Sequence, residues 1–262
     1  MTEGPTARLI AEKITKKFGN ERIVSVLSKK KNFDGSMFVG KTFSHAETIG
    51  KNIFLVFKNF GTAIRLHLMM WGAVHIYLLD ENLRKDERFV RLILFGRKRK
   101  LVVYNAPIIE AISLKSLADW RNSVFDPFNR WDEKELLKKI EGLDCSIEEL
   151  LLNQSLFAGI GNILKNEILF RAKVHPYSKV SAIPAKKLAE IIEIAGSLTF
   201  RFYEQKKKSG RIKPLLNVYR RANQKCFVCN SKIKMFRSKF TGRINFVCER
   251  CQKLYKDLSA KP

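Results

Sequence analysis

A pair of closely spaced glycines constrains the middle of this chain more than any other feature. Gly159 and Gly161 lie in segment 153–176, where apolar residues on both sides recur at helical spacing. This pattern predicts a helix, a sharp turn and a second helix. Asn162 would open the second helix, where free N–H groups and the helix dipole favour an anion such as a phosphate. Glycine placement alone leaves open an ordinary helical hairpin.

The composition favours a polyanionic partner. The 262 residues include 50 Lys and Arg against 25 Asp and Glu, a formal net charge of +25. Charge of this size bears on polyanion binding rather than on fold, so DNA, ribosomal RNA and an acidic membrane surface all fit it. No apolar run approaches the roughly 18–20 residues that span a bilayer. The first residues carry charges and no apolar signal core, so we expect a protein that is not secreted.

Four of the five cysteines have the spacing of a metal site. Cys226 and Cys229 form one Cys-x2-Cys pair, and Cys248 and Cys251 form a second pair after 18 intervening residues. Two such pairs on adjoining hairpins complete a tetrahedron around Zn²⁺ at about 2.3 Å. The spacing favours one structural zinc ion over two disulfides, a rubredoxin-type iron site or redox dithiols. Cys145 is left over as a small apolar residue.

Segment 153–176 also contains three short motifs in a fixed order. They are Gln-Ser-Leu at 154–156, Gly-x-Gly-Asn at 159–162 and Asn-Glu-x-Leu-Phe at 166–170. The segment closely resembles the helix–two-turn–helix element of the Fpg/Nei family of DNA glycosylases, in which these motifs have the same order and distances. The resemblance covers nearly the whole chain.

The resemblance implies an α+β multidomain fold. It places an N-terminal β-sandwich at residues 1–120, a central helical helix–two-turn–helix domain at 121–222 and a C-terminal zinc-finger β-hairpin at 223–262. Alternating apolar residues within 53–79 independently predict β-hairpins. The family organisation implies that DNA runs between the two larger domains.

The N-terminus resembles a minority of the family. Most members begin Met-Pro-Glu and use the proline amine, after Met removal, to attack C1′ of the damaged nucleotide, whereas this chain begins Met1-Thr2-Glu3. The resemblance implies that the Thr2 α-amine is the nucleophile and Glu3 the general acid and base. An α-amine with a pKa of about 7.7–8 is partly neutral near neutral pH. We expect weaker strand cleavage than with proline, because the imine of a primary amine must first be protonated.

The resemblance also assigns residues that contact DNA. Lys51, the third catalytic residue that the resemblance implies, matches a lysine at the start of a strand that contacts the phosphate beside the lesion. Met70 matches the residue that wedges into the base stack, and Met69 stands where the family has glycine. Without the resemblance, Lys51 would be a solvated strand residue and Met70 a core residue. The other DNA-binding residues implied are Asn162, Lys165, Tyr219, Arg220 and Arg243.

The resemblance therefore implies a base-excision-repair DNA glycosylase with abasic-site lyase activity. Its partner would be DNA with damaged bases or abasic sites, bound by a monomer in the cytoplasm or nucleoid of a prokaryote or the nucleus of a eukaryote. The short segment 203–219 implies oxidised pyrimidines or hydantoins over 8-oxoguanine. The family's Arg-Arg-Phe-Gly motif is missing from 101–111, so we expect a preference for single-stranded DNA.

Two other functions are compatible with parts of the chain. The first is a noncatalytic DNA- or damage-binding protein on the same scaffold, against which the retained Glu3 argues. The second is an N-terminal threonine hydrolase with the Thr2 hydroxyl as nucleophile. The cysteine pairs and the glycine turn give the hydrolase no support.

Overall fold

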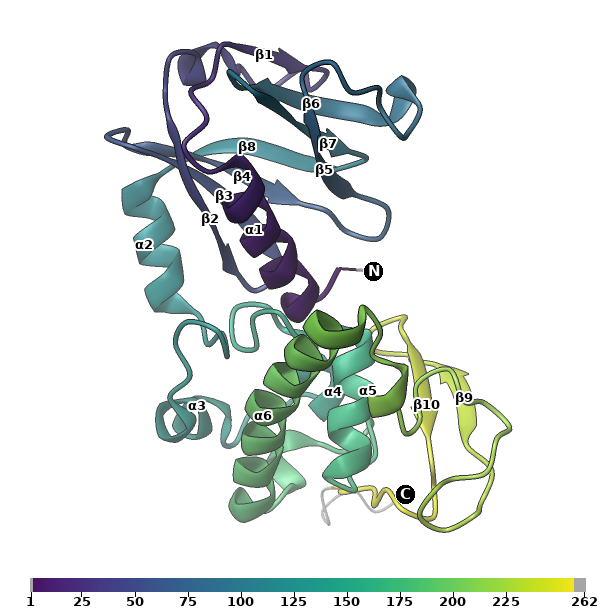
Figure 1. Cartoon of the computed structure of the whole chain (residues 1–262). Helices are drawn as coiled ribbons and strands as arrows, with labels where there is room; N and C mark the ends of the chain where they lie inside the picture. The colour runs from purple at the N-terminus through teal and green to yellow at the C-terminus, as the bar shows by residue number, and fades with distance from the viewer. Residues whose placement is uncertain (1, 257–262) are drawn as a thin grey trace. The chain divides into compact units, whose positions relative to one another are not determined.

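The computed structural model describes residues 2–256. The chain divides into two compact units, Met1–Asn122 and Ser123–Pro262, and Figure 1 shows the strands of the first and the helices of the second. No helix in residues 2–256 is both long enough and apolar enough to cross a membrane.

The first unit contains one N-terminal helix and two four-stranded antiparallel sheets. One sheet has the order β1-β6-β7-β5, made of β1 (Ser25–Ser28), β6 (Val90–Phe95), β7 (Arg99–Tyr104) and β5 (Ala73–Leu78). The other has the order β2-β3-β4-β8, made of β2 (Phe43–Ile49), β3 (Asn52–Phe57), β4 (Thr62–His67) and β8 (Ile108–Ser113). The short helices are η1 (Ser36–Phe38) and η2 (Glu87–Phe89), and α2 (Leu114–Ser123) follows β8.

Apolar side chains from both sheets share one core. Phe57 of β3, Leu94 of β6 and Val103 of β7 are all buried in it. Helix α1 (Gly4–Phe18) joins this core through Ala11 and further apolar residues at helical spacing. Two sheets that pack face to face over a common core form a β-sandwich, so the expectation for this part of the fold is confirmed.

The second unit is mainly helical and ends in a β-hairpin. Its helices are α3 (Glu133–Ile140), α4 (Ile147–Leu152), α5 (Asn162–Arg171) and α6 (Ala185–Ser209), with short helices η3 (Val180–Ala182) and η4 (Lys213–Leu215). Strands β9 (Lys234–Arg237) and β10 (Ile244–Val247) pair antiparallel as the hairpin. Helix α4 begins at a capping box formed by Ser146 and Glu149, and α6 ends at Gly210 in the left-handed conformation.

The hairpin packs against the helical part of the same unit. Phe246 of β10 and the buried Cys248 lie in one apolar cluster with Phe170 of α5 and Tyr219. Apart from residues 121 and 122, the expected segments 121–222 and 223–262 thus belong to a single compact unit. The division of the chain into three domains stays a prediction.

Candidate active site and nucleic-acid interface

Thr2 and Glu3 lie directly before α1 and are both buried, with exposed fractions of 8% and 5%. Helix α1 begins at Gly4, and Pro5 fits its first turn because a residue there needs no N–H for a helical hydrogen bond. The carbonyl oxygen of Glu3 accepts a hydrogen bond from the Thr6 N–H at 2.9 Å. The start of α1 thereby fixes Thr2 and Glu3, two of the three predicted catalytic residues. Met1, whose removal the predicted chemistry requires, lies outside the described residues.

The loop between β4 and β5, residues 68–72, lies next to Thr2. It contains Met70, the predicted wedge residue, and is called the wedge loop below. The main-chain nitrogen of Thr2 donates to the carbonyl oxygen of Met69 at 3.1 Å. The loop is closed by a hydrogen bond of 2.8 Å from the Gly72 N–H to the Leu68 oxygen. A Cβ on Gly72 would come within 2.5 Å of that oxygen, so the turn requires glycine. The structure thus brings the predicted nucleophile to the predicted wedge loop.

Met69, which stands where the resemblance places a glycine, has a left-handed backbone conformation. Its φ is 48°, in the left-handed region, which costs a residue with a Cβ on the order of 1–2 kcal/mol. Its N–H donates to Nδ1 of His67 at 3.2 Å. The loop therefore holds a residue with a Cβ in the left-handed region.

Three consecutive apolar side chains are exposed at the tip of this loop. The exposed fractions are 48% for Met69, 52% for Met70 and 77% for Trp71. Met70 is therefore a surface residue, whereas its residue type alone would predict a core position. Sequence reasoning misses Trp71, whose only signal is an aromatic residue beside the turn glycine.

Lys51 is half-buried in the tight turn between β2 and β3, where Gly50 has a φ of 56°. The next residue, Asn52, pairs with His67 in the register of β3 and β4. Burial lowers the pKa of His67 below its usual value, and the positive charges of Lys51 and Arg65 lower it further. The first unit therefore brings Lys51 and His67 together, and His67 in turn holds the wedge loop.

Acidification is expected to loosen this loop. A depressed folded-state pKa means that the stability from neutral His67 is present above the unfolded value of about 6.5 and is lost as the pH falls through the folded value. On going from pH 7.5 to 5.5, the melting temperature of the wild type should therefore fall further than that of His67→Asn. His75 and His175 also have lowered pKa values, but they are common to both proteins. Equal shifts in the two proteins would contradict the role of His67.

In the second unit, α5 begins at Asn162, and the preceding Gly161 supplies no side-chain cap. The Asn162 side chain donates from Nδ2 to the Ile244 oxygen of β10 at 3.0 Å. Its Oδ1 is buried and has no hydrogen-bond partner among the described residues. The helix start is therefore tied to the hairpin by one side of the amide, while the other side is unsatisfied.

Gln154 shapes the turn between α4 and α5. Its Nε2 donates to the Ile160 oxygen at 2.9 Å, and its Oε1 accepts from the Gly159 N–H at 3.2 Å. Gly159 has a φ of 94°, as expected for the glycine turn. The motif residue Gln154 thus supports the turn that presents Asn162.

The expectation that Lys165 contacts DNA is wrong. Its side chain has an exposed fraction of 0%, and its ammonium donates to Asn245 at 2.5 Å and lies 3.4 Å from the buried Glu148 carboxylate. The position is one turn into α5, on the face that packs inside the unit. Lys165 therefore has a structural partner set and presents no charge at the surface.

The remaining predicted DNA contacts differ in exposure. Arg220 and Arg243 are exposed, and the Arg220 guanidinium lies 5.7 Å from the Tyr219 ring centroid. Tyr219 itself is only 9% exposed and packs edge-on against Phe246. Sequence reasoning misses Glu167, whose buried carboxylate accepts from the Tyr219 N–H at 2.9 Å and thereby fixes this segment.

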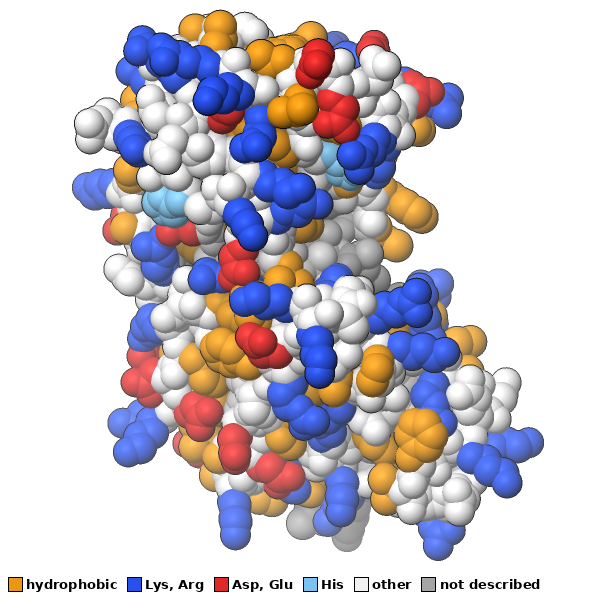
Figure 2. All heavy atoms as spheres, viewed as in Figure 1, with side chains coloured by type: hydrophobic (Ala, Val, Ile, Leu, Met, Phe, Trp, Pro, Cys, Tyr) orange, Lys and Arg blue, Asp and Glu red, His pale blue; other side chains and the backbone are white. Residues whose placement is uncertain are grey.

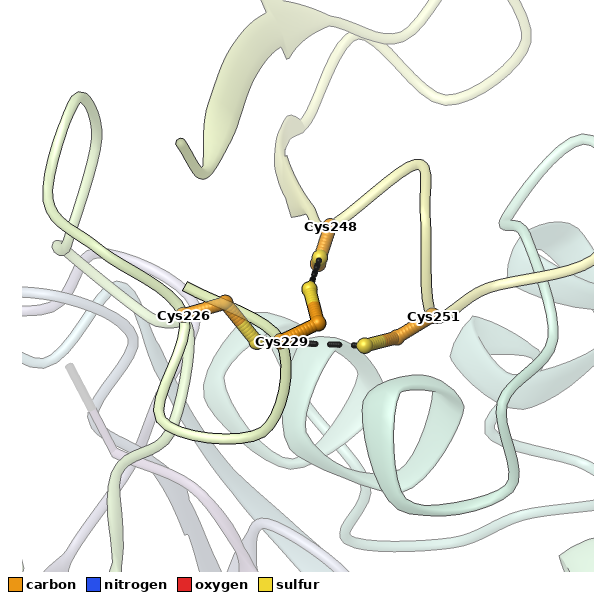
Figure 3. Close-up of side chains that lie close together, drawn as sticks. All are labelled: Cys226, Cys229, Cys248 and Cys251. Carbon is orange, nitrogen blue, oxygen red and sulfur yellow. Dashed lines mark hydrogen bonds between the residues drawn. The ribbon is translucent and has the colours of Figure 1, made fainter. Parts of the chain in front are cut away.

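The four paired cysteines converge at the open end of the hairpin, away from its turn, as Figure 3 shows. This end is called the foot of the hairpin below. Their sulfur atoms all lie within 4.8 Å of one another, with 3.4 Å between Cys229 and Cys248 and 3.9 Å between Cys226 and Cys251. None of the four is in a disulfide bond, so the disulfide alternative is excluded in this structure. Tetrahedral ligands at about 2.3 Å from a zinc ion would be about 3.8 Å apart. The cluster therefore fits one metal ion.

Comparison with known proteins decides the family. Residues 125–213 match the model of the formamidopyrimidine-DNA glycosylase H2TH domain. A formamidopyrimidine-DNA glycosylase of Syntrophomonas wolfei is 31% identical over 235 residues, which are 81% of this chain and 83% of that protein. The chain belongs to the Fpg/Nei family of DNA glycosylases. The helix–turn–helix of α4 and α5 is thus the H2TH element of this Fpg/Nei protein.

Other Fpg/Nei relatives extend beyond the region that they share with this chain. Endonuclease 8-like 3 of Homo sapiens is 25% identical over 83% of this chain, and the one from Xenopus laevis is 26% identical over 84%. The chain spans about a third, 36%, of the length of each of these relatives. In a solved complex between Lactococcus lactis Fpg and an abasic site containing DNA, the protein has the same fold. Its TM-score is 0.86 and its identity is 21%, over 96% of this chain and 99% of that one.

Proposed function

We propose that this protein is a base-excision-repair DNA glycosylase with abasic-site lyase activity. The observation that carries the proposal is the buried pair Thr2 and Glu3 at the start of α1, with the Thr2 nitrogen 3.1 Å from the Met69 oxygen. A buried carboxyl beside a future terminal amine is the pair of groups that the chemistry requires. Family membership supports the same activity.

The proposed reaction begins once Met1 is removed. The Thr2 amine forms a bond to C1′ of the damaged nucleotide while the bond from C1′ to the base breaks, and the base leaves with a proton. Glu3 protonates the ribose ring oxygen, so that the sugar opens and a protonated Schiff base remains. Loss of a proton from C2′ then expels the 3′ phosphate. The hydrogen bond to Met69 would orient the amine during the attack.

Phosphate contacts are proposed for one residue of the first unit and three of the second. Lys51 would contact the phosphate beside the lesion, and Lys and Arg side chains are spread over the face in Figure 2. In the second unit Asn162 begins α5, where the first main-chain N–H groups and the helix dipole favour a phosphate, and Arg220 and Arg243 are exposed. The largely buried Tyr219 would support Arg220 more than touch DNA itself.

We propose that the four-cysteine site holds one structural Zn²⁺. Cys226, Cys229, Cys248 and Cys251 supply four thiolates, the ligand set that suits this ion, and leave no open position for a substrate. When bound, the ion would cross-link the foot of the hairpin that carries Arg243.

The proposed substrates are oxidised pyrimidines or hydantoins in single-stranded or open DNA, with 8-oxoguanine a poor substrate. Helix α6 occupies segment 203–219 as far as Ser209, which leaves little chain for a loop that covers a purine. The turn between β7 and β8 is only 105–107, so it supplies no second wedge for an orphaned strand.

Matched oligonucleotides test the proposed function. Each carries one oxidised pyrimidine, one hydantoin or one 8-oxoguanine, as a single strand and as a duplex, and base release is measured separately from strand scission. We expect faster base release from single strands with the first two lesions, and scission slower than release. Equal or faster duplex cleavage would refute the strand preference. Binding with no release of any base would favour a noncatalytic damage-binding protein.

Trp71 is expected to contribute to single-strand affinity. Stacking of one base on an aromatic ring is worth about 1–3 kcal/mol, so Trp71→Ala should weaken binding of a single-stranded oligonucleotide about 5- to 150-fold. Trp71→Phe should retain most of the affinity. Leu78→Ala, which removes a 52% exposed side chain from β5, is the matched control. Fluorescence anisotropy measures all four proteins, and equal affinity of the two alanine variants would contradict stacking.

A further inference from the structure

A buried ion pair in the second unit has no part in the proposed chemistry. The side chains of Glu148 in α4 and Lys165 in α5 are both fully buried, and Oε2 of Glu148 lies 3.4 Å from Nζ of Lys165. Well-packed apolar residues in place of a buried ion pair are often as stable or more so. The free energy of folding alone therefore does not explain why Glu148 and Lys165 are charged and buried. Their hydrogen bonds indicate a different role.

The Glu148 carboxylate holds the hairpin of β9 and β10 on both sides of its turn. Its Oε1 accepts from the Ser238 hydroxyl at 2.5 Å, just after β9. Its Oε2 accepts from the Asn245 side chain in β10 at 2.9 Å. Lys165 donates to the oxygen of the same Asn245 amide at 2.5 Å. One buried carboxylate thus ties α4 and α5 to both sides of the hairpin turn.

Ser238 passes this anchoring on to the turn of the hairpin. Its hydroxyl oxygen accepts from the N–H groups of Phe240 and Thr241, both at 3.0 Å. Its own N–H donates to the carbonyl oxygen of Arg243 at 2.8 Å. The backbone of Arg243 is therefore bonded to a residue that Glu148 holds.

The same strand is fixed to the start of α5. Asn162 and Asn166 both donate to the Ile244 oxygen, at 3.0 and 3.3 Å, and Asn166 accepts from the Phe246 N–H at 2.8 Å. Ile244 lies between Arg243 and the buried Asn245. The network therefore places Arg243 at a set position relative to Asn162.

We propose that Glu148, charge-balanced by Lys165, is a positioning residue that holds Arg243 and Asn162 in register for the phosphates of one DNA strand. The cysteine cluster fixes the foot of the hairpin, and Glu148 fixes its turn. This inference rests on the proposed function, because it needs Arg243 to contact phosphate.

The salt dependence of DNA binding tests the proposal. The probe is an undamaged single-stranded oligonucleotide, and each lost phosphate contact lowers the slope of log affinity against log salt by about 0.7. We expect Arg243→Ala and Glu148→Gln each to lower the slope by about this amount, and the double variant to lower it no further. Additive losses in the double variant would overturn the proposal, because independent effects would then explain both.

Two further variants separate positioning from folding and from net charge. Ser238→Ala removes the link from Glu148 to the turn and leaves the ion pair intact, so it should lower the slope even where Glu148→Gln folds poorly. Glu141→Gln makes the same chemical change at an exposed position and should leave the slope unchanged. Metal content and melting temperature show that each compared protein is folded.

The outcomes distinguish this inference from the function on which it rests. If Arg243→Ala leaves the slope unchanged, the proposed phosphate contact fails, and with it the need to position it. If Arg243→Ala lowers the slope while Glu148→Gln and Ser238→Ala leave it unchanged, only the positioning role is overturned. Base release by the wild-type protein tests the proposed activity separately, and its outcome does not depend on either of these binding results.

Discussion

Glu3→Gln is expected to lower the rate of base release by about 100- to 10,000-fold, the usual contribution of a general acid or base. Glutamine has nearly the same shape as glutamate but cannot donate the proton that opens the ribose ring. Single-turnover base release from a lesion-containing single strand measures the effect. Glu3 is only 5% exposed, but its side chain makes no capping hydrogen bond to α1. Because glutamine also fills the same volume, the fold should tolerate the change.

Two controls define the Glu3 result. Affinity for undamaged DNA should stay close to that of the wild type, because Glu3 is not a proposed phosphate contact. On a preformed abasic site the loss should be smaller, because the base is already gone and the aldehyde is available to the amine. Base release within a few-fold of the wild-type rate would contradict the role of Glu3.

Cys248→Ser is expected to remove the bound metal and most of the DNA affinity. Binding of Zn²⁺ to four thiolates contributes about 10–16 kcal/mol to the folding of small zinc modules, and Cys248 is fully buried at the end of β10. Because β10 packs in the same cluster as Tyr219, loss of the metal should displace Tyr219 and Arg243 together. We expect the affinity for single-stranded DNA to fall at least tenfold, about the effect of losing two phosphate or stacking contacts. Zinc content is measured on the same samples.

Cys145→Ser is the matched control for the metal site. Cys145 is half-buried in the same unit, away from the four-cysteine cluster, and burial raises the pKa of its thiol, with the nearby acidic groups Glu149 and Asp144 adding to the effect. The variant should keep its zinc and its DNA affinity. If Cys248→Ser keeps wild-type affinity after loss of the metal, the hairpin has no part in DNA binding.

The sequence was enough to predict features that depend on local pattern. Apolar spacing around Gly159 and Gly161 predicts α4, the turn and α5, and the two cysteine pairs predict the sulfur cluster. Alternation along 53–79 predicts strands of the sandwich. These signals depend on residues close together in the chain, where periodicity and turn chemistry act directly.

Features that depend on distant partners were beyond sequence reasoning. Lys165 is one turn into a predicted anion-binding helix, which favours a DNA contact, but its partners Glu148 and Asn245 are 17 and 80 residues away along the chain. The exposure of Trp71 likewise depends on how the loop closes through Leu68 and Gly72. Single-sequence patterns carry no information on such pairings, so the polar network needed the structure.

The most direct test of the central claim is borohydride trapping on a single-stranded oligonucleotide with one abasic site. Mass spectrometry of the trapped peptide then locates the adduct. We predict a covalent adduct on the α-amine of Thr2, in a chain from which Met1 has been removed. A processed chain that binds the oligonucleotide but forms no adduct, or forms it on another residue, would contradict Schiff-base chemistry at Thr2.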